Sequence, residues 1–487
     1  MNAVVLERDA GQPEEALLRM NDIFARQRAA FAAERDPSEA VRRDRLDRAI
    51  ALLSDHRRDW GDAMAADFCG RSQELTLIVD IVGSIDALRF ARKNLRRWMA
   101  PERRRANFPY NVLGGGAEIQ WQPKGVVGNI VPWNFPVAAM FAPLAGILAA
   151  GNRALIKFSE LAPHTAALCE ELLPRAFDAS EVASVCGGPE LGAAFAGLPF
   201  DHLLFTGSTR VGALVMQAAA ANLTPVTLEL GGKSPVVIGQ EADLSLAARR
   251  VVWGKLLNAG QACIAPDYVL VPRDRLEDFI QSLQREVARQ YPSLGDNPDY
   301  TSIISAAHMQ RLRAYVEDAR DRGARIVEIN PRCEDLAART DTRKLAPTLI
   351  VAPPGDSRVM QEEIFGPLLP LLPYERLSDA IGHITARPHP LALYCFGSAA
   401  EAEAVLAGTI SGGAVVNDTM VHVLQDRLPF GGVGASGMGA YHAEFGFRTF
   451  SHARSVFRSP RADALTLLRP PYGAAAKHML NWMARRR

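Results

Sequence analysis

The sequence contains few cysteines, and their spacing excludes several classes of protein. Six occur among 487 residues, and the nearest two, Cys169 and Cys186, lie 17 positions apart. That spacing excludes a Cys-x-x-Cys redox or zinc motif, and so few cysteines do not make a secreted disulfide scaffold. The ten histidines form no His-x-His or His-x-x-x-His pair, which argues against a metal site. We therefore expect free thiols, a cytoplasmic location and no metal.

The sequence also lacks a charge excess and a long apolar run. Its 55 basic and 54 acidic residues leave a net charge of +1, which gives no electrostatic signal for nucleic acid. The most apolar stretch, Phe135–Gly151, is interrupted by Pro143 and is too short to cross a membrane, so it predicts a buried helix. The N-terminus carries early acidic residues and no apolar core, unlike a signal peptide. Neither a nucleic-acid partner nor stable membrane insertion is expected.

Helical and strand-like segments are present throughout the chain. Residues 13–100 show apolar positions at helical spacing, which predicts a helical N-terminal region. Beyond them short apolar strands alternate with helices, as in RALIKFS followed by HTAALCEELLPRAF, and this predicts a parallel, doubly wound α/β fold. The length exceeds what one core organises, so two or three domains are expected. The glycine-rich segment Leu424–Gly446 predicts a long loop, and residues 467–487 predict a helix after a Pro-Pro break.

One cysteine has an unusual setting. Cys263 lies in NAGQACIAPDY, residues 258–268, among small and polar residues. A structural cysteine is usually buried and inert, whereas a reactive one lies in a distinct polar environment. Gly260, Gln261 and Ala262 keep bulk away from the sulfur on one side. The setting raises the question of whether Cys263 is a nucleophile or a packing residue.

Four further patterns each combine a chemical and a plain structural interpretation. Gly207 follows a strand in LLFTGSTRVG and precedes a helix whose N-terminus could bind a phosphate, or could simply be capped. Lys157 and Glu160 end another strand and could bind a ribose, or form an exposed ion pair. Glu229 ends an apolar strand, where desolvation would raise its pKa toward that of a general base unless backbone groups satisfy it. Asn134 is held between two prolines and could donate to an oxyanion.

Together these patterns resemble one family, the aldehyde dehydrogenases. The resemblance rests on the order of seven residues: Asn134, Lys157, Glu160, Gly207, Glu229, Cys263 and Glu363. PFGGVGASGMGAYHAEFGFRTFSH, residues 429–452, resembles the C-terminal signature of the class 3-like branch, which includes enzymes of fatty and aromatic aldehydes and bacterial coniferyl aldehyde dehydrogenases. The resemblance covers nearly the whole chain after about residue 45. It implies a Rossmann-like cofactor domain, an α/β catalytic domain and a small β bridging element.

The resemblance implies a sequence of reactions. Cys263 would attack the aldehyde carbon and form a thiohemiacetal, while the Asn134 amide and the Cys263 backbone N–H hold the oxyanion. Hydride transfer to NAD or NADP would leave a thioester, and Glu229 would deprotonate the water that hydrolyses it. The substrate would be an aromatic aldehyde such as coniferyl aldehyde, or a medium- to long-chain aliphatic aldehyde.

The resemblance also implies binding residues, domains and assembly. The implied cofactor-binding residues are Trp133, Lys157, Glu160, Gly207, Ser208, Gly212, Leu230, Glu363 and Phe365. The implied substrate-lining residues are Phe135, Ala139, Leu424 and Phe430. Residues 1–105 and 125–230 would bind the cofactor, 231–425 would form the catalytic domain, 106–124 and 446–460 would bridge a homodimer, and 461–487 would form a C-terminal tail.

Two residues depart from the family pattern, and two alternative functions remain to be considered. Phe158 and Ala443 stand where the family usually has proline and glycine. A CoA-acylating aldehyde dehydrogenase is opposed by Glu229, because such an enzyme needs no water activation. A non-catalytic binding protein on the same scaffold is opposed by the presence of Cys263, Glu229 and Asn134 together. We expect the C-terminal helix to pack near the substrate entrance rather than lie on an anionic membrane.

Overall fold

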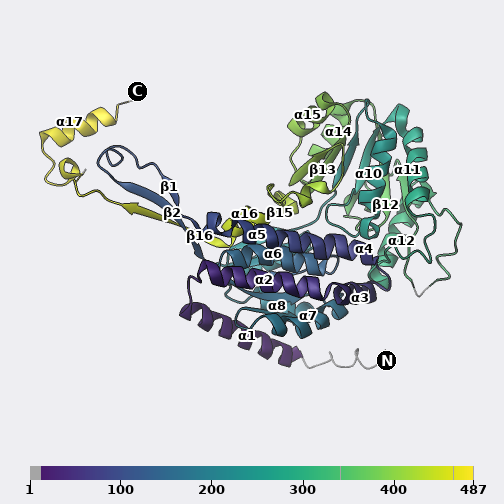
Figure 1. Ribbon diagram of the computed structural model, residues 1–487. Coiled ribbons are helices and arrows are strands. Elements are labelled where there is room, and N and C mark those ends of the chain that lie inside the picture. Colours follow the sequence, from purple (N-terminus) through teal and green to yellow (C-terminus); the bar gives the residue numbers. More distant parts are fainter. Residues whose placement is uncertain (1–12, 340–341, 464, 486–487) are drawn as a thin grey trace.

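The computed structural model describes residues 13–339, 342–463 and 465–485. Figure 1 shows two α/β units and a β arm that projects from them. One large cluster of buried apolar side chains includes residues of the N-terminal helices and of both units. The expected absence of a signal peptide concerns residues 1–12, which lie outside the described residues, as does the basic pair Arg486–Arg487.

Helices form the N-terminal layer, as the apolar spacing predicts. Their bounds are α1 Pro13–Ala33, α2 Glu39–Asp55, α3 Arg57–Phe68, α4 Gln73–Leu75 and α5 Gly83–Met99, with a π-helical segment, η1, at Thr76–Val82. Ser38 caps α2, because its hydroxyl accepts a hydrogen bond from Val41 N. Both α2 and α5 pack on α6, Pro136–Ala149. Nearly all residues of α6 are buried, which confirms the prediction of a buried helix in this stretch.

The first unit is a six-stranded sheet with the order β15-β7-β6-β3-β4-β5. Its strands are β3 Val126–Ile130, β4 Arg153–Phe158, β5 Val182–Cys186, β6 His202–Thr206, β7 Val226–Glu229 and β15 Gly437–Met438. The intervening helices are α7 Pro163–Ala176, α8 Pro189–Ala196 and α9 Thr209–Ala220. All pairs are parallel except β15 with β7. This confirms the doubly wound α/β prediction and places the carboxyl ends of β3, β4, β6 and β7 at one edge.

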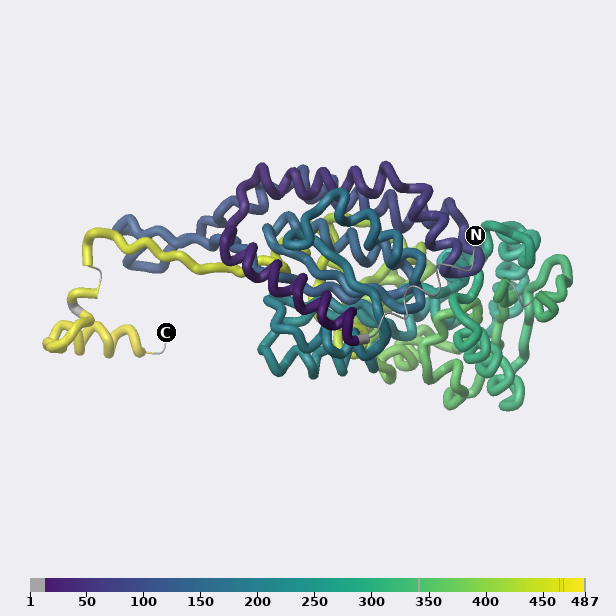
Figure 2. The backbone as a smooth tube through the Cα atoms, turned by 90° about the horizontal axis from the view of Figure 1, so that it is seen from below, coloured from purple at the N-terminus to yellow at the C-terminus, as the bar shows by residue number. Residues whose placement is uncertain are grey.

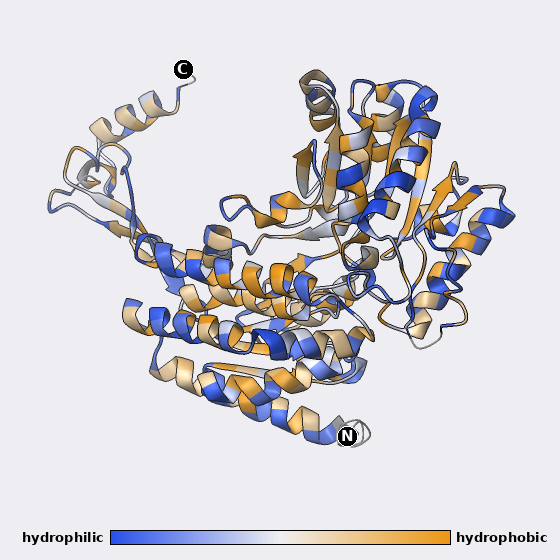
Figure 3. Ribbon diagram, turned by 45° about the vertical axis from the view of Figure 1, so that its right-hand side comes forward, coloured by the Kyte–Doolittle hydropathy of each residue, from blue (hydrophilic) through white to orange (hydrophobic). Residues whose placement is uncertain are grey.

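The second unit is a seven-stranded sheet with the order β10-β11-β12-β9-β8-β13-β14. Its strands are β8 Pro235–Ile238, β9 Tyr268–Pro272, β10 Arg325–Glu328, β11 Thr348–Val351, β12 Leu368–Tyr374, β13 Ala392–Phe396 and β14 Gly413–Val416. Its helical segments are α10 Leu244–Leu256, η2 Leu257–Gly260, η3 Arg273–Arg275, α11 Leu276–Gln290, α12 Ala306–Asp321, α13 Arg358–Gln361, α14 Leu377–Thr385 and α15 Ala399–Gly408. Within this sheet, as far as the structure describes it, only β10 runs antiparallel to its neighbour. Figure 3 shows apolar residues concentrated in the strands, which the surrounding helices cover.

The arm is a three-stranded antiparallel sheet. It consists of β1 Glu102–Arg104, β2 Gly116–Pro123 and β16 Ser451–Arg458, in the order β1-β2-β16. The strand β16 leads to η6, Thr466–Leu468, and then to α17, Ala474–Met483. The predicted C-terminal helix is therefore present. Its predicted packing on the substrate entrance of its own chain is wrong, because β16 carries it along the arm and away from the seven-stranded unit (Figures 1 and 2).

The glycine-rich segment is more ordered than the predicted long loop. Between η4, Val421–Leu424, and β16 it contains η5 Gly434–Ser436, β15 and α16 Ala443–Thr449. Gly437 pairs with Glu229 on β7. A Cβ on Gly437 would come within 2.1 Å of the Leu228 carbonyl oxygen, and its φ is +139°. The glycines here allow backbone to approach backbone, a contact that local composition does not reveal.

Candidate active site

Three residues expected to act in catalysis lie close together. Glu229 is the last residue of β7, Asn134 precedes α6, and Cys263 lies between η2 and β9. The Cys263 Sγ donates to Glu229 Oε1 over 3.7 Å. The Asn134 Nδ2 donates to the carbonyl of Gln261, two residues before Cys263, over 3.1 Å. Segments far apart in the sequence therefore bring a thiol, a carboxylate and an amide to one edge of the first sheet.

Glu229 is held by side chains rather than by the backbone. Its Oε2 accepts hydrogen bonds from the Tyr441 hydroxyl, at short range, and from the Thr206 hydroxyl at 3.5 Å. Burial raises the pKa of Glu229 to about 7, and the hydrogen bonds from Tyr441, Cys263 and Thr206 oppose the rise. The predicted increase in pKa is confirmed, and the alternative of a glutamate satisfied by backbone groups is wrong. A carboxyl group with this pKa changes charge near neutral pH, as a general base requires.

Cys263 has an environment unlike that of the two buried cysteines. No disulfide joins any of the six cysteines, all of which lie in the described ranges. Burial first, and then the charges of Glu229 and Glu363, raise the pKa of Cys263 well above its usual range. The thiol of Cys263 is therefore neutral at rest and donates to Glu229. By contrast, Cys169 and Cys395 are buried in the apolar core.

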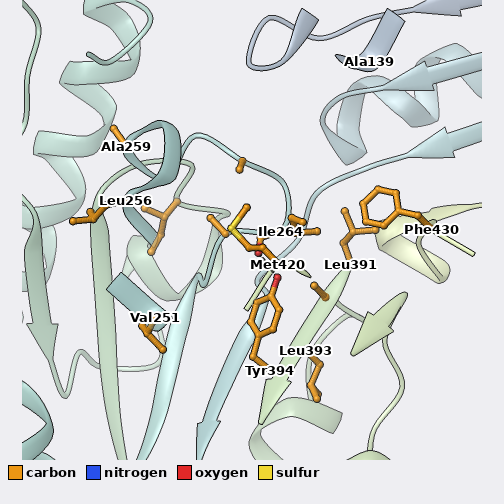
Figure 4. Close-up of a cluster of buried hydrophobic side chains, with 14 of the residues drawn as sticks. Ala139, Val251, Leu256, Ala259, Ile264, Leu391, Leu393, Tyr394, Met420 and Phe430 are labelled. Atoms are coloured by element: carbon orange, nitrogen blue, oxygen red, sulfur yellow. Dashed lines mark hydrogen bonds between the residues drawn. The ribbon is translucent and has the colours of Figure 1, made fainter. Parts of the chain in front are cut away.

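The loop that carries Cys263 is fixed from several sides. Asn258 and Ala259 have φ values of 53° and 52°, a left-handed conformation that only surrounding contacts can maintain. Gly260 is required, because a Cβ there would lie 2.3 Å from the Gly366 carbonyl oxygen. On the other side the Tyr394 hydroxyl donates to the carbonyl of Ile264. Figure 4 shows Tyr394 and Ile264 within the buried cluster that supports this loop.

The predicted ribose pair lies at the end of β4. The Lys157 Nζ is 3.6 Å from the Glu160 Oε2, and Lys157 is almost fully buried while the Glu160 side chain is 46% exposed. An ammonium and a carboxylate at the carboxyl end of a parallel strand can bind the two hydroxyls of a ribose. The pair is therefore only partly exposed, whereas the alternative interpretation expected an exposed ion pair.

The turn from β6 into α9 fits a phosphate. Ser208 caps α9 and accepts from Val211 N over 3.4 Å. A Cβ on Gly207 would lie 2.5 Å from the Phe205 ring, and one on Gly212 would lie 2.6 Å from Leu230 Cδ2. Glycine at both positions keeps the helix start close to the sheet. The N-terminal amide groups of α9 are thus positioned for an anion.

A second carboxyl group, that of Glu363, lies beside the catalytic loop. Burial first, and then the charge of Asp267, raise the pKa of Glu363 to about 8, while an N–H from Gly232 lowers it. The Glu363 carboxyl lies against Gly231, where a Cβ would come within 2.1 Å of it. Phe365 has a φ of 50°, and its ring lies 5.3 Å from that of Trp133. The predicted cofactor residues Trp133 and Phe365 are thus in contact.

The four predicted substrate-lining residues have different environments. The Arg71 guanidinium carbon lies 4.8 Å from the centre of the Phe135 ring. Ala139 is buried on α6. Phe430 is buried and stacks on the ring of His442 at 4.9 Å. Figure 4 shows Ala139 and Phe430 in one buried cluster. Leu424 is 60% exposed, so it lies outside that cluster.

Sequence reasoning missed three residues that contact this site. Tyr441 lies 212 positions from the Glu229 carboxyl that it contacts. Arg71 donates to the Asn134 carbonyl and pairs with Asp80, and both side chains are fully buried. Tyr441 lies in a glycine-rich segment, and Arg71 and Asp80 lie in the region predicted to be helical. No local signal in the sequence distinguishes them.

Comparison with known proteins agrees with this geometry. The Aldehyde dehydrogenase family matches residues 13–456. A coniferyl aldehyde dehydrogenase of a Pseudomonas species is 52% identical over 443 residues, covering 91% of each chain. Aldehyde dehydrogenase family 3 member B3 of Mus musculus is 38% identical over 476 residues, covering 96% of this chain and 94% of the other. The substrate-bound structure of Staphylococcus aureus AldH has a TM-score of 0.89 at 36% identity, covering 95% of this chain and 99% of that one.

The match extends over most of the chain and shows its family. The chain belongs to the aldehyde dehydrogenase family, and it has the fold of that family. It is an oxidoreductase that oxidises an aldehyde with NAD(P). In the described part of the chain no group of three or more His, Cys, Asp or Glu side chains could hold a metal ion. None of the helices in the described ranges is long and apolar enough to cross a membrane.

Proposed function

We propose that Cys263 is the nucleophile, Glu229 the general base for deacylation, and Asn134 a donor to the oxyanion. The partly buried contact between Cys263 and Glu229 carries this assignment. Loss of the Cys263 proton to solvent gives the thiolate, which attacks the aldehyde carbon and forms a thiohemiacetal. The Asn134 Nδ2 and the Cys263 N–H donate hydrogen bonds to its oxyanion. When bound, NAD(P)+ supplies the hydride acceptor. Glu229 then deprotonates a water molecule, which hydrolyses the thioester on Cys263.

We propose two groups of residues for the cofactor. Lys157 and Glu160 would hold the adenine-side ribose, and the start of α9 at Gly207 and Ser208, with Gly212 and Leu230 behind it, would hold the pyrophosphate. Glu363 would hold the nicotinamide ribose, with Phe365 and Trp133 packed beside it. The Glu160 carboxylate would repel a 2′-phosphate, which favours NAD over NADP. Initial rates with each cofactor, in the wild type and in Glu160→Gln, test this preference.

We propose an aromatic aldehyde such as coniferyl aldehyde as the substrate. The 52% identical relative is a coniferyl aldehyde dehydrogenase. Phe135 follows Asn134 in the chain, Phe430 lies in the same buried cluster as Ile264 (Figure 4), and aromatic side chains suit a planar ring. Medium- and long-chain aliphatic aldehydes are the second candidate class. Comparing kcat/KM over a panel of both classes decides between them.

We propose that the protein is a cytoplasmic homodimer joined through its arm. The segments 106–124 and 446–460 would form the bridging element, because β2 and β16 pair with each other and project away from the seven-stranded unit. Phe457 on β16 is half exposed, and the α17 side chains of Trp482 and Met483 are mostly exposed, as an interface in the free chain would be. Residues 1–105 and 125–230 would form the cofactor domain, 231–425 the catalytic domain and 461–487 the tail. Sedimentation of the full chain tests this assembly, and a chain ending at residue 460, which keeps the arm, should remain a dimer.

A single assay separates this function from its alternatives. NADH formation is measured on adding an aldehyde, with and without CoA. We expect turnover without CoA and a free carboxylic acid as product, because Glu229 is buried beside Cys263 in the position of a base. Turnover that requires CoA would show a CoA-acylating enzyme, and the absence of turnover with either cofactor would favour a non-catalytic binding protein.

A further inference from the structure

An ion pair is completely buried beneath the candidate active site. The Arg71 Nη2 lies 2.7 Å from the Asp80 Oδ2, and neither side chain has exposed surface. Removing two charges from water costs as much as their attraction returns, so a buried pair is weak evidence for stability. A role in positioning other residues would account for the buried pair. The contacts of the Arg71 guanidinium group indicate which residues it positions.

The guanidinium group of Arg71 joins the two loops that carry the reactive side chains. Its Nη1 donates to the Asn134 carbonyl over 2.7 Å and to the Asn258 Oδ1 over 3.0 Å. Its Nε donates to the Thr76 hydroxyl over 3.2 Å. Asn134 is the proposed oxyanion donor, and Asn258 belongs to the strained start of the Cys263 loop. The rigid fork of an arginine fixes both acceptors relative to each other, which a lysine does not.

Asp80 fixes the same structure from the other side. Its second oxygen accepts from Ala138 N over 3.0 Å, in the first turn of α6. Asp80 and Thr76 both lie on η1, the π-helical segment, and π-helical turns occur frequently at functional sites. The π-helical turn thus places a hydroxyl and a carboxylate around one guanidinium group, and the carboxylate also holds the helix that follows Asn134.

Asn258 connects Arg71 to the loop that carries Cys263. Because its Oδ1 accepts from Arg71, its Nδ2 points away and donates to the carbonyls of Asn134 and Gln261, each over 3.2 Å. The Asn134 Nδ2 also donates to the Gln261 carbonyl. Without the donor at Arg71, the Asn258 amide could rotate and release the carbonyls that define the position of Asn134.

We propose that Arg71 is a positioning residue that acts through Asn134 and Asn258 and sets the geometry of the oxyanion site. Arg71 makes no contact with the Cys263 sulfur among the described hydrogen bonds and ion pairs, so it acts only through other residues. The proposal rests on the proposed role of Asn134. The proposal goes beyond that role, because it adds Arg71 and Asp80 to the residues that determine the rate of hydride transfer.

A double-mutant cycle tests whether Arg71 acts through Asn134. NADH formation is followed in a single turnover for wild type, Arg71→Lys, Asn134→Ala and the double variant, normalised to titrated thiols. We expect Asn134→Ala to slow the step about 10²- to 10³-fold, as loss of an oxyanion donor does. Arg71→Lys should slow it about tenfold in the wild type and less than about twofold in Asn134→Ala, since coupled residues are not additive. The KM for aldehyde should change little in Arg71→Lys, because the lost contact acts in the transition state.

Control variants separate this coupling from damage to the fold. Arg42 is a buried arginine that donates to the Ala149 carbonyl and pairs with Asp36, so Arg42→Lys should leave the single-turnover rate unchanged. If Arg71→Lys does not fold, Arg71→Gln with Asp80→Asn removes both charges together and takes its place in the cycle.

Two results would overturn the proposal, and they differ. Equal losses from Arg71→Lys in both backgrounds would show a structural role independent of Asn134. A normal rate in Asn134→Ala would refute the oxyanion role itself, and the role of Arg71 with it.

Discussion

The two carboxyl groups near Cys263 differ in how the fold holds them. Glu229 ends a strand and is held by the side chains of Tyr441 and Thr206, and its pKa is about 7. Glu363 lies on a loop and receives a backbone N–H, beside the charge of Asp267, and its pKa is about 8. Both raise the pKa of Cys263, Glu229 more than Glu363. Burial thus raises the pKa of both carboxyl groups, and the rise is opposed by side-chain hydrogen bonds at Glu229 and by a backbone N–H at Glu363.

Replacing the thiol that both carboxyl groups face should have the largest effect. We expect Cys263→Ser to lower turnover by about 10³-fold or more, because a serine hydroxyl is a far weaker nucleophile here. Folding and cofactor binding should persist, since the change removes little packing volume. Steady-state rates and fluorescence titration with NADH measure the two properties. Turnover near that of the wild type would show that another group is the nucleophile.

Replacing Glu229 should separate the two halves of the reaction. We expect Glu229→Gln to release about one NADH per active site in a burst and then to turn over about 10²- to 10⁴-fold more slowly, because deacylation lacks its base. The burst should remain, since the loss of a nearby negative charge lowers the pKa of Cys263. Rapid mixing with aldehyde measures the burst. Its absence would show that Glu229 is needed before hydride transfer, to accept the Cys263 proton.

Tyr441 should determine where Glu229 titrates. Its hydrogen bond lowers the pKa of Glu229, so Tyr441→Phe should raise that pKa by about one unit. Glu229 acts as a base only when ionised, so deacylation is lost as the pH falls through this pKa. The acidic limb of the kcat profile should therefore move to higher pH by the same amount. An unchanged limb with a uniformly lower kcat would mean that Tyr441 supports packing alone.

Glu363 should affect the thiol less than Glu229 does. In the absence of cofactor, the rate of Cys263 alkylation by iodoacetamide rises as the thiol ionises. We expect Glu363→Gln to move this rise to lower pH by less than about one unit, and Glu229→Gln to move it further. The effect of Glu363→Gln should appear mainly above pH 8, where Glu363 is ionised. A larger shift in Glu363→Gln would reverse the order of the two carboxyl groups.

The sequence predicted some parts of this site and not others, for physical reasons. The burial of Glu229 follows from an apolar strand that ends at a glycine pair, which is local information. The alternation of strands and helices predicted the sheet edge at which Asn134, Lys157 and Glu229 meet. The contact of Tyr441 with Glu229 spans 212 positions, and the Arg71–Asn134 bond spans 63. Such pairs form only when the whole fold closes, so no local pattern contains them.

The smallest effect concerns Ala443, two residues after Tyr441. Its φ is 48°, a left-handed conformation that costs a residue with a Cβ about 1–2 kcal/mol. The family's usual glycine avoids this cost but adds freedom to the unfolded chain, worth about 0.4–1 kcal/mol. We expect Ala443→Gly to raise the free energy of unfolding by about 0.5–1 kcal/mol. Ala404 is exposed within α15, so Ala404→Gly is the matched control and should lower that free energy by about 1 kcal/mol. Urea denaturation measures both.

A loss of stability in Ala443→Gly would show that contacts of the Ala443 methyl group outweigh its backbone strain. A gain without a change in the acidic limb of the kcat profile would show that the Tyr441–Glu229 contact does not depend on this strain.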